Sequence, residues 1–175
     1  ASVRHVAWMA RDTLNRCLVD LMLPALDQDI AEGSKGVILQ GALECGHPDA
    51  LTQAERLLPK LTENLARETV GTVLSHRGPD AFDPLLASYK SRPAQGGIVN
   101  AIAYADPRRA GDLFAEWIER PFPPTDDAPL RNMLVSLARG DIPNSARLLG
   151  RILERRPPEW LARSTVDALV ALERS

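Results

Sequence analysis

Cysteine and histidine are scarce in this sequence, which has two cysteines and three histidines in 175 residues. Cys17 and Cys45 are too few and too far apart for a disulfide framework, so we expect reduced thiols and a cytoplasmic location. A catalytic zinc site on a helix uses two histidines four residues apart, a spacing that His5, His47 and His76 lack. The sequence therefore predicts no metal ligand and no cofactor in this chain.

An excess of charge of one sign is also missing, because 21 basic residues face 23 acidic ones. The basic residues are scattered rather than arranged in a stripe, so we do not expect nucleic acid as a partner. No apolar run reaches the roughly 18 residues that would cross a bilayer, so we do not expect membrane insertion. With 45% hydrophobic residues the chain has the composition of a globular protein, and its length predicts a single domain over residues 1–175.

Motifs for nucleotide binding or nucleophilic catalysis are not found either. The glycines nearest to a phosphate loop, in EGSKG at 32–36 and at Gly96 and Gly97, fit neither GxGxxG nor GxxxxGK[ST]. Cys45 and His47 are two residues apart, so they would point to different faces of a helix or lie in a loop. We therefore predict no catalytic residue and expect no catalytic activity from this chain alone.

What the sequence does contain is a repeat. Four prolines, Pro48, Pro79, Pro107 and Pro143, recur roughly every thirty residues, the period of helix-pair repeats. We expect each proline in the first turn of a helix, where its missing N–H has no partner.

An apolar stripe follows each proline, at the third, sixth and tenth residues beyond it. The stripe ends in a large side chain, which we expect to be buried at an equivalent place in each copy: Leu58, Tyr89, Trp117 and Leu153. The second and third residues of the stripe lie three and seven positions after the first, and such residues share one face of an α-helix. A second apolar helix precedes each proline, so the repeating unit is helix, tight turn, helix.

The predicted fold class is all-α. We expect an α-solenoid of stacked antiparallel helix pairs, HEAT/ARM-like, with about ten helices, no sheet and more than about 60% helix against a base rate near one third. The pairs should occupy about residues 34–155. A cap helix at about residues 2–27 and a closing helix at about residues 159–173 should cover the two ends of the array.

Pairs of like charges are the remaining candidates for a site. The pair at 126–127 precedes a predicted helix and the pair at 155–156 ends one, as the helix dipole favours. Arg108 and Arg109 instead lie near a helix start, where the dipole disfavours them. They are either exposed arginines of no special role or candidate interaction residues.

Three consecutive stretches resemble a known family: RETVGTVLSHRGPDAFDPLLASYKS, IVNAIAYADPRRAGDLFAEWIE and APLRNMLVSLARGDIPNSARLLGRILE. In this order they are similar to the C-terminal helical domain of gluzincin zinc aminopeptidases, of the alanyl, puromycin-sensitive and endoplasmic-reticulum type. The family pattern includes a Tyr-Lys pair, here Tyr89 and Lys90, and a helix ending in Ala before an Asp-Pro turn, here Ala105, Asp106 and Pro107. The likeness covers about residues 34–154.

The resemblance implies a bowl of helix pairs that closes the substrate chamber over a separate catalytic domain of the same polypeptide. Zinc and the HExxH motif belong to that other domain, and no functional residue is carried over to this sequence. The alternative is a stand-alone HEAT-like scaffold that binds a protein or peptide in its concave face. Both interpretations predict the same fold.

Overall fold

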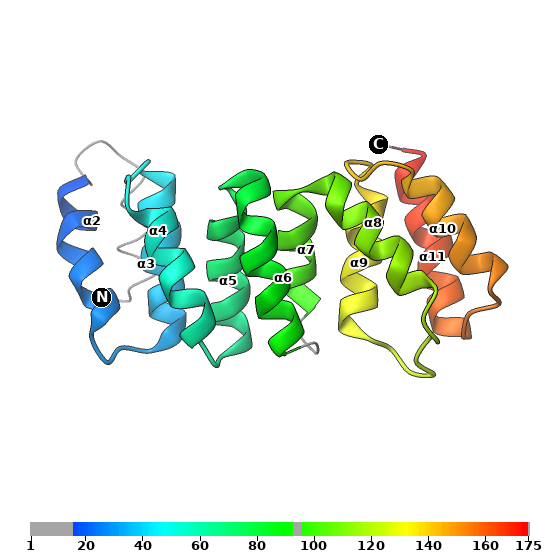
Figure 1. Ribbon diagram of the computed structural model, residues 1–175, viewed down its shortest axis with the longest axis horizontal. Helices are drawn as coiled ribbons and strands as arrows, with labels where there is room; N and C mark the ends of the chain where they lie inside the picture. Colours follow the sequence, from blue (N-terminus) through cyan, green and yellow to red (C-terminus); the bar gives the residue numbers. More distant parts are fainter. Residues whose placement is uncertain (1–15, 93–95, 175) are drawn as a thin grey trace. The chain divides into compact units, whose positions relative to one another are not determined.

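The computed structural model describes residues 16–92 and 96–174. Of these residues 76% are helical, in ten α-helices and three short 3-10 segments, and the described chain contains no strand. The all-α helical-repeat prediction is therefore confirmed. The chain divides into two compact units, Ala1–Arg77 and Gly78–Ser175, which are drawn in Figure 1. The predicted single domain over residues 1–175 stays a prediction. None of the described helices has the length and apolar character needed to span a membrane.

In the first unit, α3 is the central element, because it packs against α2, α4 and α5. A small core joins Val19 of α2, Ala42 of α3 and Ala50 of α4. The bounds of its elements are α2 (Arg16–Met22), η2 (Leu23–Asp27), α3 (Glu32–Glu44), α4 (Ala50–Leu57), η3 (Leu58–Lys60) and α5 (Asn64–Ser75). The helix pair predicted before and after Pro48 is thus formed by α3 and α4.

The second unit repeats this pairing. Helix α7 packs on α9 and α9 on α11, while α8 packs on α10, so two layers of alternate helices form a stack. The bounds are η4 (Gly78–Ala81), α6 (Phe82–Ser91), α7 (Gly96–Ala105), α8 (Pro107–Ile118), α9 (Ala128–Ala138), α10 (Ser145–Glu154) and α11 (Glu159–Leu172). The pairs α7/α8 and α9/α10 are the ones expected around Pro107 and Pro143.

The helix starts differ from one another more than the repeat predicts. Only Pro107 lies in the first turn of an α-helix, where the Asp106 carboxylate accepts a 3.0 Å hydrogen bond from the backbone N–H of Arg109. Pro48 and Pro143 lie in turns two residues ahead of α4 and α10, and Pro79 lies in the 3-10 segment η4. The prediction of a first-turn position is therefore correct for Pro107 alone.

The buried face of one helix is also shifted relative to the others. Counted from the preceding proline, Leu149 and Ile152 of α10 hold the positions of Ala54 and Leu57 of α4, and all four are buried. In α8, which begins at the proline itself, the buried face lies one residue later.

The predicted stripe is therefore only partly correct. Leu58 and Trp117 are 2% and 6% exposed. Tyr89 and Leu153 are only half-buried, so these two predictions were wrong.

Of the two predicted cap helices, the closing one is present and the opening one differs from the prediction. Residues 2–15 of the opening helix lie outside the described residues. From Arg16 the chain is α-helical only to Met22, and it then continues as the 3-10 segment η2, which contains Pro24 near its start. Proline removes an N–H and clashes with the preceding turn of an α-helix, which explains why one continuous helix to residue 27 was wrong. The closing helix is present as α11.

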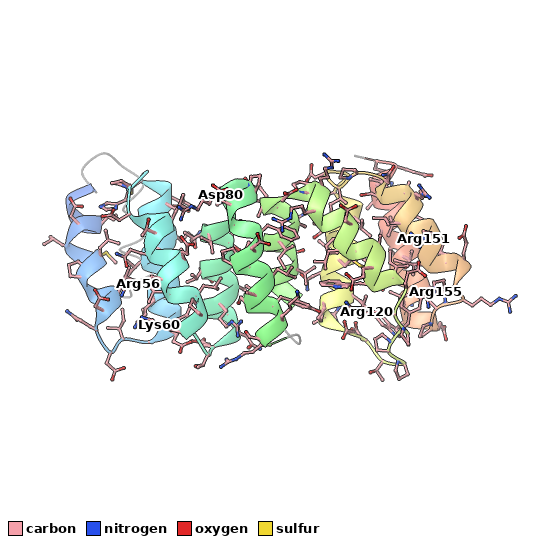
Figure 2. All side chains as sticks on the ribbon, in the orientation of Figure 1. Arg56, Lys60, Asp80, Arg120, Arg151 and Arg155 are labelled. Carbon is pink, nitrogen blue, oxygen red and sulfur yellow. The ribbon has the colours of Figure 1, made fainter. Side chains whose placement is uncertain are left out.

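The loop between α8 and α9 is held against α10 and α11 by Arg151, Arg155 and Trp160, and the two arginines are labelled in Figure 2. Arg155 Nη1 donates to the backbone carbonyl of Arg120 at 3.1 Å, and its guanidinium lies 4.9 Å from the ring centre of Phe122. Arg151 forms an ion pair with Glu119. Trp160 Nε1 donates to the carbonyl of Pro123 at 3.3 Å. These contacts fix the loop across the ends of α10 and α11.

Candidate functional site

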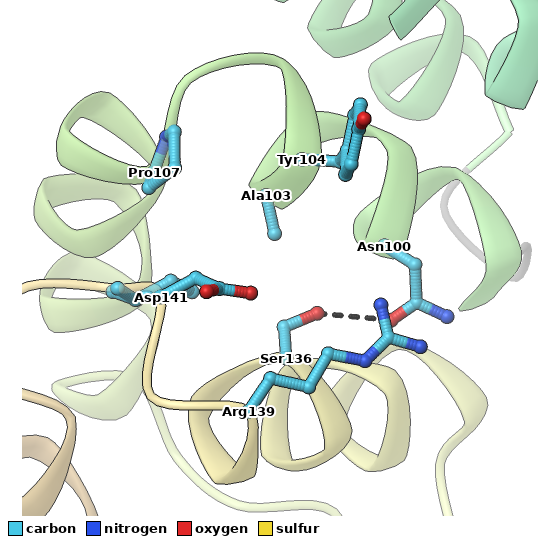
Figure 3. A pocket seen from close by; sticks show the side chains of 8 residues that line it. Asn100, Ala103, Tyr104, Pro107, Ser136, Arg139 and Asp141 are labelled. Atoms are coloured by element: carbon cyan, nitrogen blue, oxygen red, sulfur yellow. Dashed lines mark hydrogen bonds between the residues drawn. The ribbon is translucent and has the colours of Figure 1, made fainter. Parts of the chain in front are cut away.

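A cavity of about 320 Å³ opens in the second unit between α7, α9 and the turn that leads to α10 (Figure 3). Asn100, Ala103 and Tyr104 of α7 line one side. Ser136 of α9 lies at the floor, and Arg139 and Asp141 come from the turn that follows α9. This volume is near the lower end of the roughly 300–1,000 Å³ typical of ligand pockets.

A ladder of polar side chains connects α7 and α9 beneath the cavity. Ser136, which is 3% exposed, donates from Oγ to Asn100 Oδ1 at 2.9 Å. Asn100 Nδ2 donates to Asn132 Oδ1 at 2.5 Å, and Asn132 Nδ2 donates to the backbone carbonyl of Ala128 at 2.9 Å. The ladder gives hydrogen-bond partners to polar groups that would otherwise be costly to bury.

Gly96 explains how close the two helices come at the end of this ladder. A Cβ atom at this position would lie 2.3 Å from Asn132 Nδ2 and 2.6 Å from the carbonyl oxygen of Ala128. Distances this short exclude any side chain at residue 96. The start of α7 therefore rests directly against the first turn of α9, which brings Asn100 within reach of Asn132 and Ser136.

The rim of the cavity carries one cation and one anion. Arg139 and Asp141 flank Gly140, whose φ of 78° lies in the left-handed region and turns the chain sharply after α9. Figure 3 shows the Asp141 carboxylate directed into the cavity from one side and the Arg139 guanidinium beside Asn100 on the other. Neither side chain has an ion pair or a hydrogen bond with the described residues, and both are exposed.

Tyr104 completes the rim with an aromatic ring. It is 58% exposed, which makes it one of the few large hydrophobic side chains of the described chain that lie open to solvent. Aromatic residues with a polar tip are common at binding surfaces because they provide a large contact area with little loss of conformational entropy.

The predicted interaction residues Arg108 and Arg109 do not line this cavity. Arg109 forms a two-point ion pair with Asp83, with Nη2 to Oδ1 at 2.5 Å and Nη1 to Oδ2 at 3.3 Å, and its guanidinium lies 4.0 Å from the ring centre of Phe82. The hydrogen bond from Arg109 lowers the pKa of Asp83, and the same bond raises the pKa of Arg109. Arg109 thus joins α8 to α6, while Arg108 is exposed on α8.

His47, considered above together with Cys45, makes structural contacts through both ring nitrogens. His47 Nδ1 accepts a 3.1 Å hydrogen bond from the backbone N–H of Asp49, and Nε2 lies 2.9 Å from Asp20 Oδ1. With Nδ1 acting as acceptor, Nε2 carries the proton and donates to the carboxylate. His47 therefore connects α2 to the turn before α4. Among the residues at 16–92 and 96–174, no group of three His, Cys, Asp or Glu side chains could hold a metal ion.

A second cavity, of about 250 Å³, lies in the first unit between α3 and α5. Several of its polar side chains are already bonded within their own helices. Thr69 and Thr72 donate to the carbonyls of Leu65 and Glu68, and Gln40 donates to Glu44. A hydroxyl that donates to the preceding helical turn has no hydrogen left and can only accept a bond from a ligand.

One signal for the cavity of the second unit is present in the sequence. Asn100 interrupts the apolar stretch IVNAIAYA, and such a polar residue within a buried helix needs a partner. Ser136, Arg139 and Asp141 have no motif of their own, because only the fold brings them to the side of α7.

No protein-family model, curated protein or solved structure matches the chain. The resemblance to aminopeptidase domains therefore stays a prediction, as does the free-scaffold alternative.

Proposed function

We propose that the chain is a non-catalytic helical-repeat module and that its second unit binds a short peptide segment in the cavity between α7 and α9. The observation that carries this proposal is the polar ladder at the floor of the cavity. Apolar side chains would pack two repeat helices together without any need for hydrogen bonds. Three polar side chains in this interface, next to an open cavity, favour a role in binding.

The ladder has hydrogen-bonding capacity left over. Asn100 uses one of its two amide hydrogens on Asn132 and one lone pair of Oδ1 on Ser136. One N–H and one lone pair remain, since a primary amide offers two donors and two acceptor sites. A peptide bond presents the complementary pair, one carbonyl and one N–H. Asn100 can therefore hold the main chain of a peptide irrespective of its sequence.

The size and rim of the cavity agree with this ligand. About 320 Å³ accommodates a few residues rather than a folded partner. Tyr104 offers its exposed ring to one side chain of the segment, and the open side of the cavity lets a longer chain enter and leave.

The test is selection of heptapeptides by phage display against the whole chain, followed by fluorescence anisotropy with one selected peptide. Tyr104 and Arg139 line the cavity, so Tyr104→Ala and Arg139→Gln should each weaken binding of the peptide. For Tyr104→Ala we expect a loss of affinity of about fivefold or more, because truncating an aromatic contact residue commonly costs at least 1 kcal/mol. Both side chains are exposed, so both variants should fold normally, which circular dichroism checks.

Two control variants separate this cavity from the rest of the surface. Arg147→Gln changes an exposed residue of α10 outside the cavity, and Gln40→Ala changes the cavity of the first unit. Both should bind the peptide with wild-type affinity. A peptide whose affinity falls with Gln40→Ala and not with Tyr104→Ala would refute the proposal, and so would failure to select any peptide.

A further inference from the structure

We propose that the cavity of the second unit recognises a ligand with two opposite charges, binding its cationic group at Asp141 and its anionic group at Arg139. This inference rests on the proposed function and narrows the ligand to a short zwitterionic segment. The two ends of a short free peptide provide such a charge pair, and so do a basic and an acidic side chain within a longer one.

First, Arg139 and Asp141 differ from several charged neighbours in having no ion pair with the described residues. Four arginines of the second unit form ion pairs: Arg109 with Asp83, Arg120 with Glu116, Arg131 with Asp126 and Arg151 with Glu119. Arg108 and Arg147 also have no ion pair with the described residues, so Arg139 and Asp141 are set apart by lining the cavity together. Arg139 and Asp141 are only two residues apart and have opposite charges, yet they form no ion pair with each other. Because Gly140 turns the chain between them, the two side chains approach the cavity from different sides.

The second step is the charge of the cavity as a whole. Arg139 alone would favour any anion, and Asp141 alone would favour any cation. With both present the rim is neutral, and a ligand with a single charge meets repulsion at one side as well as attraction at the other. A ligand with both charges, placed at opposite ends, gains at both sides.

The third step is the position of the polar floor. In Figure 3, Ser136 lies between the Asp141 carboxylate and the Arg139 guanidinium, where the middle of the ligand would be, and Asn100 lies beside the guanidinium. A dipeptide or tripeptide has an ammonium group, at least one peptide bond and a carboxylate in this order. Asp141, the Ser136 hydroxyl and Arg139 present the complementary groups in the same order.

The test compares the affinities of protein variants for ligands with free or blocked ends. Each affinity is measured by nuclear magnetic resonance titration of the whole chain. The ligands are dialanine, trialanine, N-acetyl-trialanine and trialanine amide. Asp141→Asn should weaken trialanine about two- to fivefold, the range of an exposed ion pair, and should leave N-acetyl-trialanine unaffected. Arg139→Gln should weaken trialanine similarly and leave trialanine amide unaffected.

A further ligand, N-acetyl-Lys-Ala-Glu amide, distinguishes the source of the charges. If this ligand binds and trialanine does not, and if Asp141→Asn and Arg139→Gln both weaken its binding, the cavity recognises the charges of ligand side chains rather than of the peptide ends. Arg147→Gln is the control that should change none of these affinities. All variants alter exposed side chains, and circular dichroism confirms their folding.

The outcomes separate this inference from the proposed function. If the peptide selected by phage display binds and is sensitive to Tyr104→Ala, whereas no zwitterionic ligand responds to either charge substitution, the polarity inference is overturned and the proposed function stands. If neither the selected peptide nor any of the small ligands binds, both are overturned. Equal losses for blocked and free ligands would also overturn the polarity inference, because the charges would then act on something other than the ligand's ends.

Discussion

Replacing Trp117 by alanine should destabilise the second unit strongly. The side chain is 6% exposed, and its ring packs against Tyr89 at 4.9 Å and against Phe114 at 5.4 Å between ring centres. Truncating a buried Trp or Phe to Ala typically costs about 3–5 kcal/mol, and each aromatic pair contributes about 0.5–1.5 kcal/mol beyond its buried area. With two such pairs, we expect a loss of about 4 kcal/mol.

Urea unfolding followed by far-ultraviolet circular dichroism measures this loss. For an m-value of about 2 kcal/mol/M, the unfolding midpoint should fall by about 2 M. Tyr104→Ala is the matched control, since it removes an aromatic ring that is 58% exposed and should change stability by no more than about 0.5 kcal/mol. A loss below about 1 kcal/mol for Trp117→Ala would show that this ring is not part of the core.

Three further predictions concern the register of the repeat, the first unit and the resemblance. Leu149→Ala should cost about 2–5 kcal/mol and Leu153→Ala clearly less, because Leu149 is fully buried and Leu153 only partly; equal losses in urea unfolding would contradict the register described here. Hydrogen bonds from Glu63 N–H, and then from Thr62, lower the pKa of Glu32 below its ordinary 4.5, so its contribution to stability is present above pH 4.5 and is lost as the pH falls through the lowered value. Glu32→Gln should therefore unfold at lower urea than the wild type at pH 7, with the gap closing below pH 4.5, and a gap independent of pH would refute this. If the aminopeptidase resemblance is correct, adding the chain to a catalytic fragment of that family should give a complex in gel filtration and change how hydrolysis depends on peptide length; no complex with such fragments would count against it.

The fold was largely accessible from the sequence, because prolines and apolar spacing are local signals. Helix, turn and helix follow from residues within about thirty positions of one another, and the pairs α3/α4, α7/α8 and α9/α10 formed where this pattern indicated. The register was less accessible. Whether a helix begins at its proline, as α8 does, or two residues beyond it, as α4 and α10 do, depends on how the preceding turn closes, and the buried face of α8 lies one residue later than in the other two.

The candidate site was much less accessible. Asn100 gave a weak signal as a polar residue in an apolar helix, but its partners Asn132 and Ser136 lie more than thirty positions away, in the next repeat. Arg139 and Asp141 look like ordinary charges at a helix end, and only the fold, which places both at one cavity, distinguishes them. Arg109 was a candidate because the helix dipole disfavours a cation near a helix start. Its ion pair with Asp83 on α6 offsets this unfavourable position.

The most direct test of peptide binding in this cavity is a nuclear magnetic resonance titration of the isotope-labelled chain with the selected heptapeptide. The largest changes in backbone amide shift should cluster at Asn100, Tyr104, Ser136 and Arg139, on both sides of the cavity. Saturable changes confined to this cluster are the predicted result. Saturable changes centred on α3 and α5, or spread over α8 and α10 with the cavity unaffected, would contradict the account.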